Sequence, residues 1–183
     1  MNMIIKSFAI LLLSTIFTVA QAQENIAKQK VALLDNIIGD WSKEEFSYSD
    51  DETLKLVSSS KITFEKTLSG FQISGATFDI TPTDAMNVGL AFTYDQYRKV
   101  YRMSVVDSIY GLMDIYEGTM NDDNNLMLDN MTSDTSFPGE GGTMYFRFTL
   151  DIKDKNKISY LIESTSNKGE KWSPMLNYVM TRD

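Results

Sequence analysis

The residues best suited to chemistry in this sequence are two aspartates on either side of a predicted turn. Asp107 and Asp114 flank Ser108-Ile109-Tyr110-Gly111, so a hairpin here would bring their carboxyl groups face to face. Two carboxyl groups with different pKa values can act as general acid and general base. Asp beside a turn more often accepts hydrogen bonds from the turn backbone. We favour the turn role, and we retain Asp107, Asp114 and Glu163 as candidates for a carboxylate-using enzyme.

A second polar cluster, Asp122-Asp123-Asn124-Asn125, contains oxygen ligands that suit Ca²⁺. It lacks the fixed spacing and the terminal Glu of a calcium-binding loop. We therefore interpret it as the tip of a hairpin and predict no metal site. Asn130-Met131-Thr132 matches a glycosylation sequon, which we interpret as accidental.

The chain contains no His and no Cys. This excludes Ser-His-Asp and Cys-His catalytic centres, His-ligated haem and the usual zinc sites. It also means that no disulfide contributes to stability. We expect no cofactor, and the lack of a spaced acidic cluster weighs further against an enzyme.

Two arginines are candidates for recognising an anionic head group, since a guanidinium bonds a carboxylate with charge-assisted hydrogen bonds. Arg147 alternates with Phe146 and Phe148, which predicts that it points away from the apolar face of its strand. Arg102 lies in a strand that is apolar on both faces. The alternation therefore leaves the direction of Arg102 open.

After Gly39 the chain has the period-two alternation of β-strands, with Ser, Asn, Asp and Gly turns between the segments. About ten short strands joined in sequence by tight turns cannot form a parallel sheet. They form either a sandwich or a closed up-and-down barrel, and only closure removes the exposed edges. The segments are 40–48, 54–64, 71–80, 86–94, 100–107, 112–118, 126–131, 144–150, 158–162 and 172–181.

A short helix is predicted before the strands, over residues 24–38. Ala27, Val31, Leu34 and Ile38 are spaced by 4, 3 and 4 residues and so share one face. Gly39 is a typical residue to end such a helix.

Gly39-Asp40-Trp41, directly after this helix, resembles the Gly-x-Trp signature of lipocalins and their calycin relatives. In that group the Trp closes one end of the barrel and an Arg from the last strand lies across the indole. Arg182 matches that position. The resemblance therefore implies contact between Trp41 and Arg182, with the helix packed against the barrel.

Further stretches make the whole of residues 33–182 similar to the DUF1579 family, bacterial proteins of unknown function with a lipocalin-like barrel. The resemblance implies an all-β, up-and-down antiparallel barrel and carries no catalytic residues with it. The matching stretches are Phe92-Thr93-Tyr94-Asp95, Arg98-Lys99-Val100-Tyr101, Val105-Val106-Asp107-Ser108, Tyr116-Glu117-Gly118, Glu163-Ser164, Gly169-Glu170-Lys171-Trp172 and Tyr178-Val179-Met180-Thr181-Arg182.

The first 22 residues have the features of a secretory signal. Lys6 provides the positive charge, residues 8–19 are apolar, and Ala20-Gln21-Ala22 is a small-x-small cleavage pattern. The apolar stretch is shorter than the about 20 residues that span a membrane. We expect a periplasmic or secreted protein in which residues 23–183 form one domain.

Cleavage after Ala22 removes Lys6 and changes the net charge from −8 to −9. An acidic protein repels phosphate backbones, so nucleic acid is not an expected partner. The sequence does not indicate an oligomeric state.

The leading functional hypothesis is a barrel that binds a small hydrophobic molecule, because about ten strands enclose more space than side chains fill. Aromatic and Met side chains on the apolar face would line it, with micromolar affinity for apolar probes, roughly −8 kcal/mol. Two alternatives are a packed barrel that binds a protein partner and, less favoured, an enzyme. The predicted lining residues are Phe64, Phe92, Met103, Phe146 and Phe148.

Overall fold

The computed structural model describes residues 26–49, 53–78, 87–133, 135–139 and 142–183. The predicted signal sequence and its cleavage site at Ala20-Gln21-Ala22 lie outside the described residues, so export remains a prediction. Within the described ranges, no helix has the length and apolar character needed to cross a membrane.

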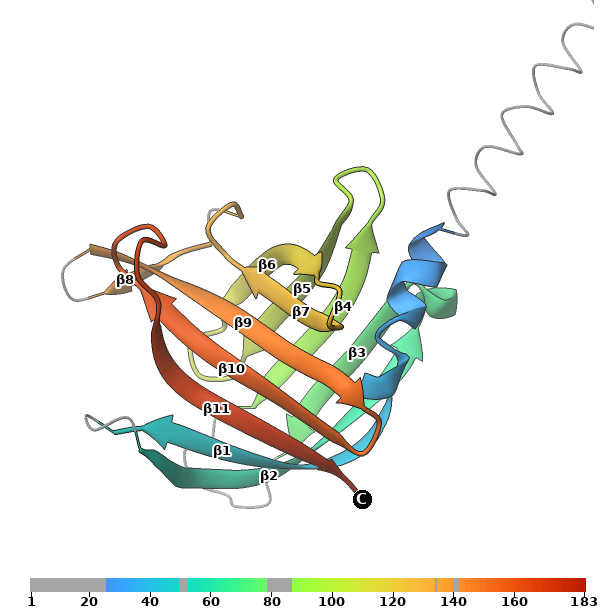
Figure 1. The fold of residues 1–183 in the computed structure, drawn as a ribbon, viewed down its shortest axis with the longest axis horizontal. Helices are drawn as coiled ribbons and strands as arrows, with labels where there is room; N and C mark the ends of the chain where they lie inside the picture. The colour runs from blue at the N-terminus through green and yellow to red at the C-terminus, as the bar shows by residue number, and fades with distance from the viewer. Residues whose placement is uncertain (1–25, 50–52, 79–86, 134, 140–141) are drawn as a thin grey trace, which may run out of the picture.

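The chain forms a closed antiparallel β-barrel (Figure 1). Ten strands follow one another around the ring as β1–β7, β9, β10 and β11, and pairing of β9 with β10 completes it. The eleventh strand, β8, pairs with β9 alone among the described strands. The predicted fold class is confirmed. The strands are β1 (Gly39–Tyr48), β2 (Leu54–Thr67), β3 (Gln72–Phe78), β4 (Val88–Asp95), β5 (Val100–Asp107), β6 (Met113–Met120), β7 (Asn125–Asp129), β8 (Phe137–Gly139), β9 (Gly142–Asp154), β10 (Lys157–Thr165) and β11 (Ser173–Arg182).

Strand β2 does not keep one face toward the interior along its length. Ser60, Ile62 and Phe64 are buried, but Leu54 and Leu56, which share their parity, are about half exposed. The register explains the difference: Glu45 pairs with Ser58, but Phe46 pairs with Leu56. One extra residue in β2 forms a bulge, and before the bulge the side chains of even-numbered residues lie on the outer face instead of the inner face. The prediction of unbroken alternation over 54–64 was therefore wrong for the first residues of this segment, Leu54 and Leu56.

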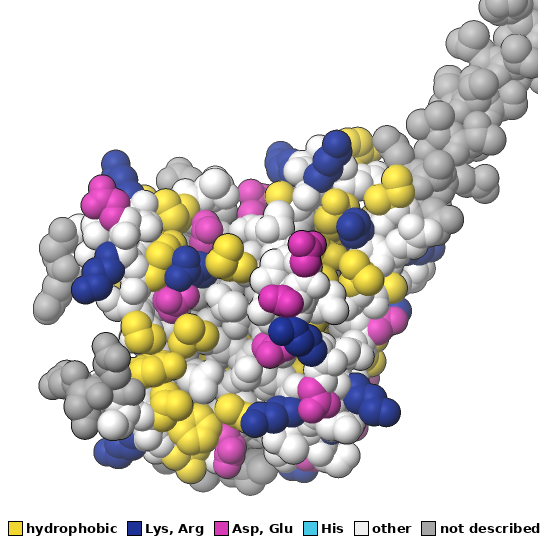
Figure 2. All heavy atoms as spheres, in the orientation of Figure 1, with side chains coloured by type: hydrophobic (Ala, Val, Ile, Leu, Met, Phe, Trp, Pro, Cys, Tyr) yellow, Lys and Arg dark blue, Asp and Glu magenta, His cyan; other side chains and the backbone are white. Residues whose placement is uncertain are grey.

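The bulge leaves hydrophobic side chains on the outside of the barrel. Figure 2 shows such side chains gathered at the lower left, where Figure 1 places β1, β2 and β11. The exposed ones include Leu54 and Leu56 of β2 and Met175 of β11.

The N-terminal helix is shorter than predicted. Residues 26–32 are α-helical, and after a turn the chain forms the 3₁₀-helix η1 (Asp35–Ile37). Ala27, Val31 and Leu34 are buried as expected, but the fourth buried residue is Ile37 rather than Ile38. A 3₁₀ turn has three residues per turn, so it carries the inward face from Leu34 to Ile37.

This helical segment covers one end of the barrel, at the right of Figure 1. The hydroxyl of Tyr101 donates to the Lys30 carbonyl over 3.1 Å, which ties the helix to β5. The Asn36 side chain donates to the Ile152 carbonyl on β9 over 2.9 Å. The lid is therefore bonded to strands on different sides of the ring. A second 3₁₀-helix, η2 (Leu68–Gly70), joins β2 to β3.

Candidate ligand-binding cavity

Trp41 and Arg182 close the helix-covered end of the barrel. They are direct partners in the β1–β11 register, and the guanidinium carbon of Arg182 lies 4.2 Å from the centroid of the Trp41 ring. Trp41 is fully buried, and its indole N–H donates to the Ile37 carbonyl over 2.7 Å. This is the contact that the Gly-x-Trp resemblance implied.

Gly39 is required by the same arrangement. Its φ of +124° is unfavourable for other residues. A Cβ placed on it would also collide with the Nη1 atom of Arg182. The glycine of the Gly-x-Trp pattern thus makes room for the guanidinium that covers the Trp two residues later.

A cavity of about 100 Å³ lies inside the barrel. Its wall comes from strands around the ring and from Ile37 of the helical lid, and it is almost entirely apolar. Four of the five residues predicted to line a cavity border it: Phe64, Phe92, Met103 and Phe148. The structure therefore brings together residues from β2, β4, β5 and β9 that sequence alternation placed on inner faces.

Phe146, the fifth predicted residue, is not among the residues that border the cavity. It is partly buried and packs edge-on against Phe137 of β8, with ring centroids 5.2 Å apart. The inner face of β9 extends past the end of the cavity, and β8 packs there. The alternation along β9 therefore predicted the face on which Phe146 lies, but not its position along the barrel axis.

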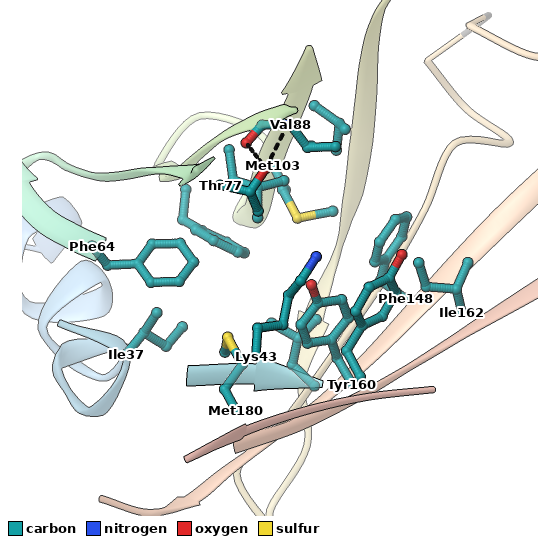
Figure 3. Close-up of a pocket in the computed structure, with 15 residues that line it drawn as sticks. Ile37, Lys43, Phe64, Thr77, Val88, Met103, Phe148, Tyr160, Ile162 and Met180 are labelled. Atoms are coloured by element: carbon teal, nitrogen blue, oxygen red, sulfur yellow. Dashed lines mark hydrogen bonds between the residues drawn. The ribbon is translucent and has the colours of Figure 1, made fainter. Parts of the chain in front are cut away.

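The polar residue that sequence reasoning missed is Lys43. It is 7% exposed and extends from β1 into the cavity (Figure 3). Its nitrogen points into the space between Phe64 and Met103 on one side and Phe148 and Tyr160 on the other. A signal existed in the sequence: a period of two counted from the inward Trp41 places Lys43 on the same face.

The neighbours of Lys43 form a small polar group at the cavity wall. Its Nζ atom lies 4.7 Å from the centroid of the Tyr178 ring and 4.0 Å from the Glu45 carboxylate. Ser58 donates to the same Glu45 oxygen over 3.1 Å. Tyr160 stacks on Tyr178 with centroids 4.5 Å apart.

Burial is the main cause of the raised pKa values of the two tyrosines in this group. Desolvation raises the pKa of Tyr178, and the Glu45 carboxylate raises it further. Desolvation also raises the pKa of Tyr160 well above its usual value, with smaller contributions from Tyr178 and Glu45. Both phenols therefore stay protonated at neutral pH and can donate hydrogen bonds.

Ser60 adds an unsatisfied hydroxyl near Lys43. The two residues are direct partners in the β1–β2 register. The Oγ atom of Ser60 is buried and has no hydrogen-bond partner among the described residues. A buried polar atom in this position normally has a partner, such as a water or a ligand.

Sequence comparison identifies the chain with one family. The model for "Protein of unknown function (DUF1579)" matches residues 27–182. The chain belongs to the DUF1579 family. No match was found among curated protein sequences.

Solved structures similar to this DUF1579 protein share its fold at low identity. The S-type phycobiliprotein lyase CPES from Guillardia theta is 11% identical with a TM-score of 0.51, over 89% of this chain and 96% of the lyase. A redesigned β-barrel is 10% identical with a TM-score of 0.40, over 82% and 94% of the two chains. A redesigned barrel bound to DFHBI is 9% identical with a TM-score of 0.31, over 80% and 99%. The lyase supports the barrel fold alone.

The two candidate aspartates of the DUF1579 barrel do not form a catalytic pair. The Asp107 carboxylate accepts from the backbone N–H groups of Ile109 and Tyr110, at 2.9 and 2.6 Å, so it stabilises the turn as favoured above. Asp114 pairs with Val105 in the register and is 3% exposed. The remaining candidate, Glu163, is ion-paired to Arg147, with 2.7 Å between Oε2 and Nη2.

Asp114 belongs to a buried structural network. The fully buried Asn130 side chain donates to Asp114 over 3.1 Å and to the Thr135 carbonyl over 3.3 Å, and accepts from the Phe146 N–H over 2.7 Å. Burial raises the pKa of the nearby Tyr116, and Asp114 raises it further. Because Asn130 has no exposed surface, the folded protein offers no glycosylation site there.

Both candidate arginines lie on the outer face of the barrel wall. Arg147 stacks over Trp172, with 4.5 Å between its guanidinium carbon and the ring centroid, and points away from the cavity as predicted. Arg102 alternates with the buried Tyr101 and Met103 and pairs with Glu117 over 2.6 Å. Neither guanidinium is placed to bind a ligand inside the barrel.

Residues 122–125 lie at the β6–β7 hairpin. The Asn121 side chain accepts from the backbone N–H groups of Asp123 and Asn125, at 3.0 and 2.9 Å. Across the described part of the chain, no three or more metal-ligating side chains gather in one place.

Proposed function

We propose that this protein binds a small apolar molecule inside the barrel. The observation that carries the proposal is the cavity of about 100 Å³, bordered by Phe64, Phe92, Met103 and Phe148. Protein interiors normally leave few voids larger than a water molecule. An apolar cavity of about 150 Å³ is large enough to bind benzene. The space here is smaller than that, so a slender alkyl chain fits it more readily than a ring.

The energetics of an empty cavity support the same proposal. Cavities cost about 24 cal/mol per Å³, which corresponds to about 2 kcal/mol for this one. Larger side chains at lining positions such as Val105 would remove that cost. A packed interior, which the partner-binding alternative requires, fits this barrel less well.

The test uses a cavity-filling variant and a control on the same strand. Val105 borders the cavity, whereas Val106 is 38% exposed on the opposite face of β5. Calorimetric titration of the purified protein with 1-octanol should show one saturable site with a Kd of about 10–100 μM, roughly −5.5 to −7 kcal/mol. Val105→Phe should abolish this binding and Val106→Phe should retain it.

Two results would overturn the proposal. The first is wild-type protein that binds neither 1-octanol nor octanoate saturably. The second is equal binding by wild type and a folded Val105→Phe variant, because the ligand would then lie elsewhere. Circular dichroism of each variant establishes that the barrel is intact.

We also propose that the protein acts outside the cytoplasm, in the periplasm or as a secreted protein. Lys6, the apolar residues 8–19 and Ala20-Gln21-Ala22 support this through their signal-like order. Cell fractionation followed by N-terminal mass analysis should find a chain that starts at Gln23 in the periplasm or medium. An intact Met1 in the membrane fraction would contradict it.

A further inference from the structure

We propose that the cavity selects ligands with an anionic head group, such as medium-chain or aromatic carboxylates, and that Lys43 binds that group. This inference rests on the proposed function and names its ligand class. It starts from the wall of the cavity: of the 15 residues drawn around it, Lys43 is the one basic residue and none is acidic.

The position of Lys43 sets the direction in which a ligand binds. Its nitrogen reaches the middle of the cavity, and the wall around it consists of Phe64, Met103, Phe148 and Tyr160 (Figure 3). An apolar tail can therefore pack on the rings while its head group meets the ammonium. The phenols of Tyr160 and Tyr178 line the same cavity. Tyr160 remains protonated and can donate to the same oxygens as Lys43, whereas the single O–H of Tyr178 is engaged with Glu45.

The electrostatics favour an anion over a neutral head group. A charge-assisted hydrogen bond is about twice as strong as a neutral one. The low dielectric of an apolar cavity increases the attraction between opposite charges. An ammonium has three N–H donors, so Lys43 can bind a ligand oxygen while it keeps protein partners.

Glu45 is a carboxylate that competes with a ligand for Lys43, and its geometry limits that competition. Its carboxylate lies 4.0 Å from the Lys43 nitrogen, which is an ion pair but too long for a hydrogen bond. The same Glu45 oxygen already accepts from Ser58. Glu45 is also not among the residues that border the cavity. An anionic head group in the cavity can therefore approach Lys43 without contacting Glu45.

The buried hydroxyl of Ser60 is consistent with a ligand in this part of the barrel. It faces inward on β2, opposite Lys43, and lacks a hydrogen-bond partner among the described residues. Ser60 does not itself border the cavity, so its hydroxyl marks an unsatisfied polar position next to the strand segment that carries Lys43.

The experiment compares three ligands that differ only in head group: octanoate, 1-octanol and octylammonium. At neutral pH, wild-type protein should bind octanoate about tenfold more tightly than 1-octanol, which is about 1.4 kcal/mol. Octylammonium should bind most weakly because Lys43 repels it. Lys43→Met should reduce the ratio of octanoate to 1-octanol affinity to about twofold or less, an amount below 0.5 kcal/mol.

Two further variants separate charge from shape. Lys43→Arg should retain the preference for octanoate, since the positive charge is kept. Glu45→Gln should increase octanoate affinity, since a competing carboxylate is removed. If Lys43→Met does not fold, Lys43→Arg and Glu45→Gln still test the inference through the octanoate to 1-octanol ratio.

Failure of this inference differs from failure of the proposed function. Equal binding of octanoate and 1-octanol to wild-type protein would overturn the head-group preference but leave the apolar site. Octylammonium as the tightest ligand would show that Glu45 governs the site and would also overturn it. Absence of binding by all three ligands would remove the proposed function itself.

Discussion

The guanidinium of Arg182 covers the indole of Trp41 at 4.2 Å and at the same time donates to three backbone carbonyls. Two of these carbonyls, those of Asn36 and Ile38, belong to the segment that joins the helical lid to β1. The third, that of Lys155, lies in the β9–β10 turn. One side chain at the C-terminal end of the last strand thus joins the first strand, the lid and a distant hairpin.

Truncating this closure should strongly destabilise the protein. Trp41→Ala removes a fully buried indole and should lower the free energy of unfolding by about 3–5 kcal/mol. Arg182→Lys keeps the charge but cannot reproduce the three hydrogen bonds, and should cost about 2–3 kcal/mol. Urea unfolding monitored by circular dichroism measures both effects.

Arg98→Lys is the matched control, because the described contacts of Arg98 are an exposed ion pair and hydrogen bonds with Asp95. Its unfolding midpoint should remain close to that of wild type. An Arg182→Lys variant as stable as Arg98→Lys would show that the arginine is dispensable for closure.

A second prediction concerns the close approach of β6 and β7. A Cβ on Gly118 would collide with the backbone carbonyl of Met127, which cannot move as a flexible side chain can. Gly118→Ala should therefore destabilise the barrel by about 2–3 kcal/mol. At Gly89 the nearest atom to an added Cβ is the Val106 oxygen at 3.9 Å, an ordinary contact. Gly89→Ala should change stability by less than about 0.5 kcal/mol. Similar unfolding midpoints for the two variants would contradict this account.

Alternation and turn chemistry were sufficient to predict the succession of antiparallel strands, because both are local, and the resemblance to lipocalins and DUF1579 selected the closed barrel over the sandwich. Alternation was not sufficient where one residue changes the register. The β2 bulge is set by pairing with β1, and nothing in 54–64 itself marks it. Strand β8 has three residues, includes Pro138 and pairs with β9, so it leaves almost no periodic signal.

The cavity was predictable in part for a similar reason. Parity gave the inward positions of Phe64, Phe92, Met103 and Phe148, but depth along the barrel axis depends on how the strands tilt and end. Phe146 has the right parity and the wrong depth. Lys43 was overlooked because lysine is almost always exposed, and that strong expectation outweighed its inward parity with Trp41.

The Asn130 network provides a third prediction. Asn130→Ala removes the amide donor to Asp114, leaves the Phe146 N–H without its side-chain acceptor and should cost about 2–4 kcal/mol. Asn130→Asp should be worse at neutral pH, because it brings a second carboxyl group next to Asp114. This variant should recover stability in acid, since its folded state binds a proton that the unfolded chain releases. Urea unfolding across acidic to neutral pH measures the trend. An Asn130→Asp variant that loses stability in acid as wild type does would contradict it.

A fourth prediction follows from the buried tyrosines. Burial raises the pKa of Tyr101 to about 12 and raises those of Tyr116, Tyr160 and Tyr178 as well. Above the usual value of 10.0, the unfolded chain loses these protons while the folded barrel keeps them. The unfolded state then binds fewer protons, so stability is fully present below pH 10 and falls as the pH rises. Each such tyrosine contributes a slope of about 1.4 kcal/mol per pH unit.

Tyr160→Phe removes one of these ionisable groups from the cavity wall and should make the alkaline loss of stability shallower by that amount per pH unit. Tyr97→Phe is the control, because Tyr97 is 81% exposed and should leave the slope unchanged. Free energies from urea unfolding, measured from just below pH 10 to about one unit above it, give the slopes directly. Equal slopes for wild type and Tyr160→Phe would mean that the Tyr160 hydroxyl ionises as readily in the folded barrel as in the unfolded chain. The Tyr160 hydroxyl would then not be buried beside Lys43, and its assignment as a hydrogen-bond donor to the ligand would be wrong.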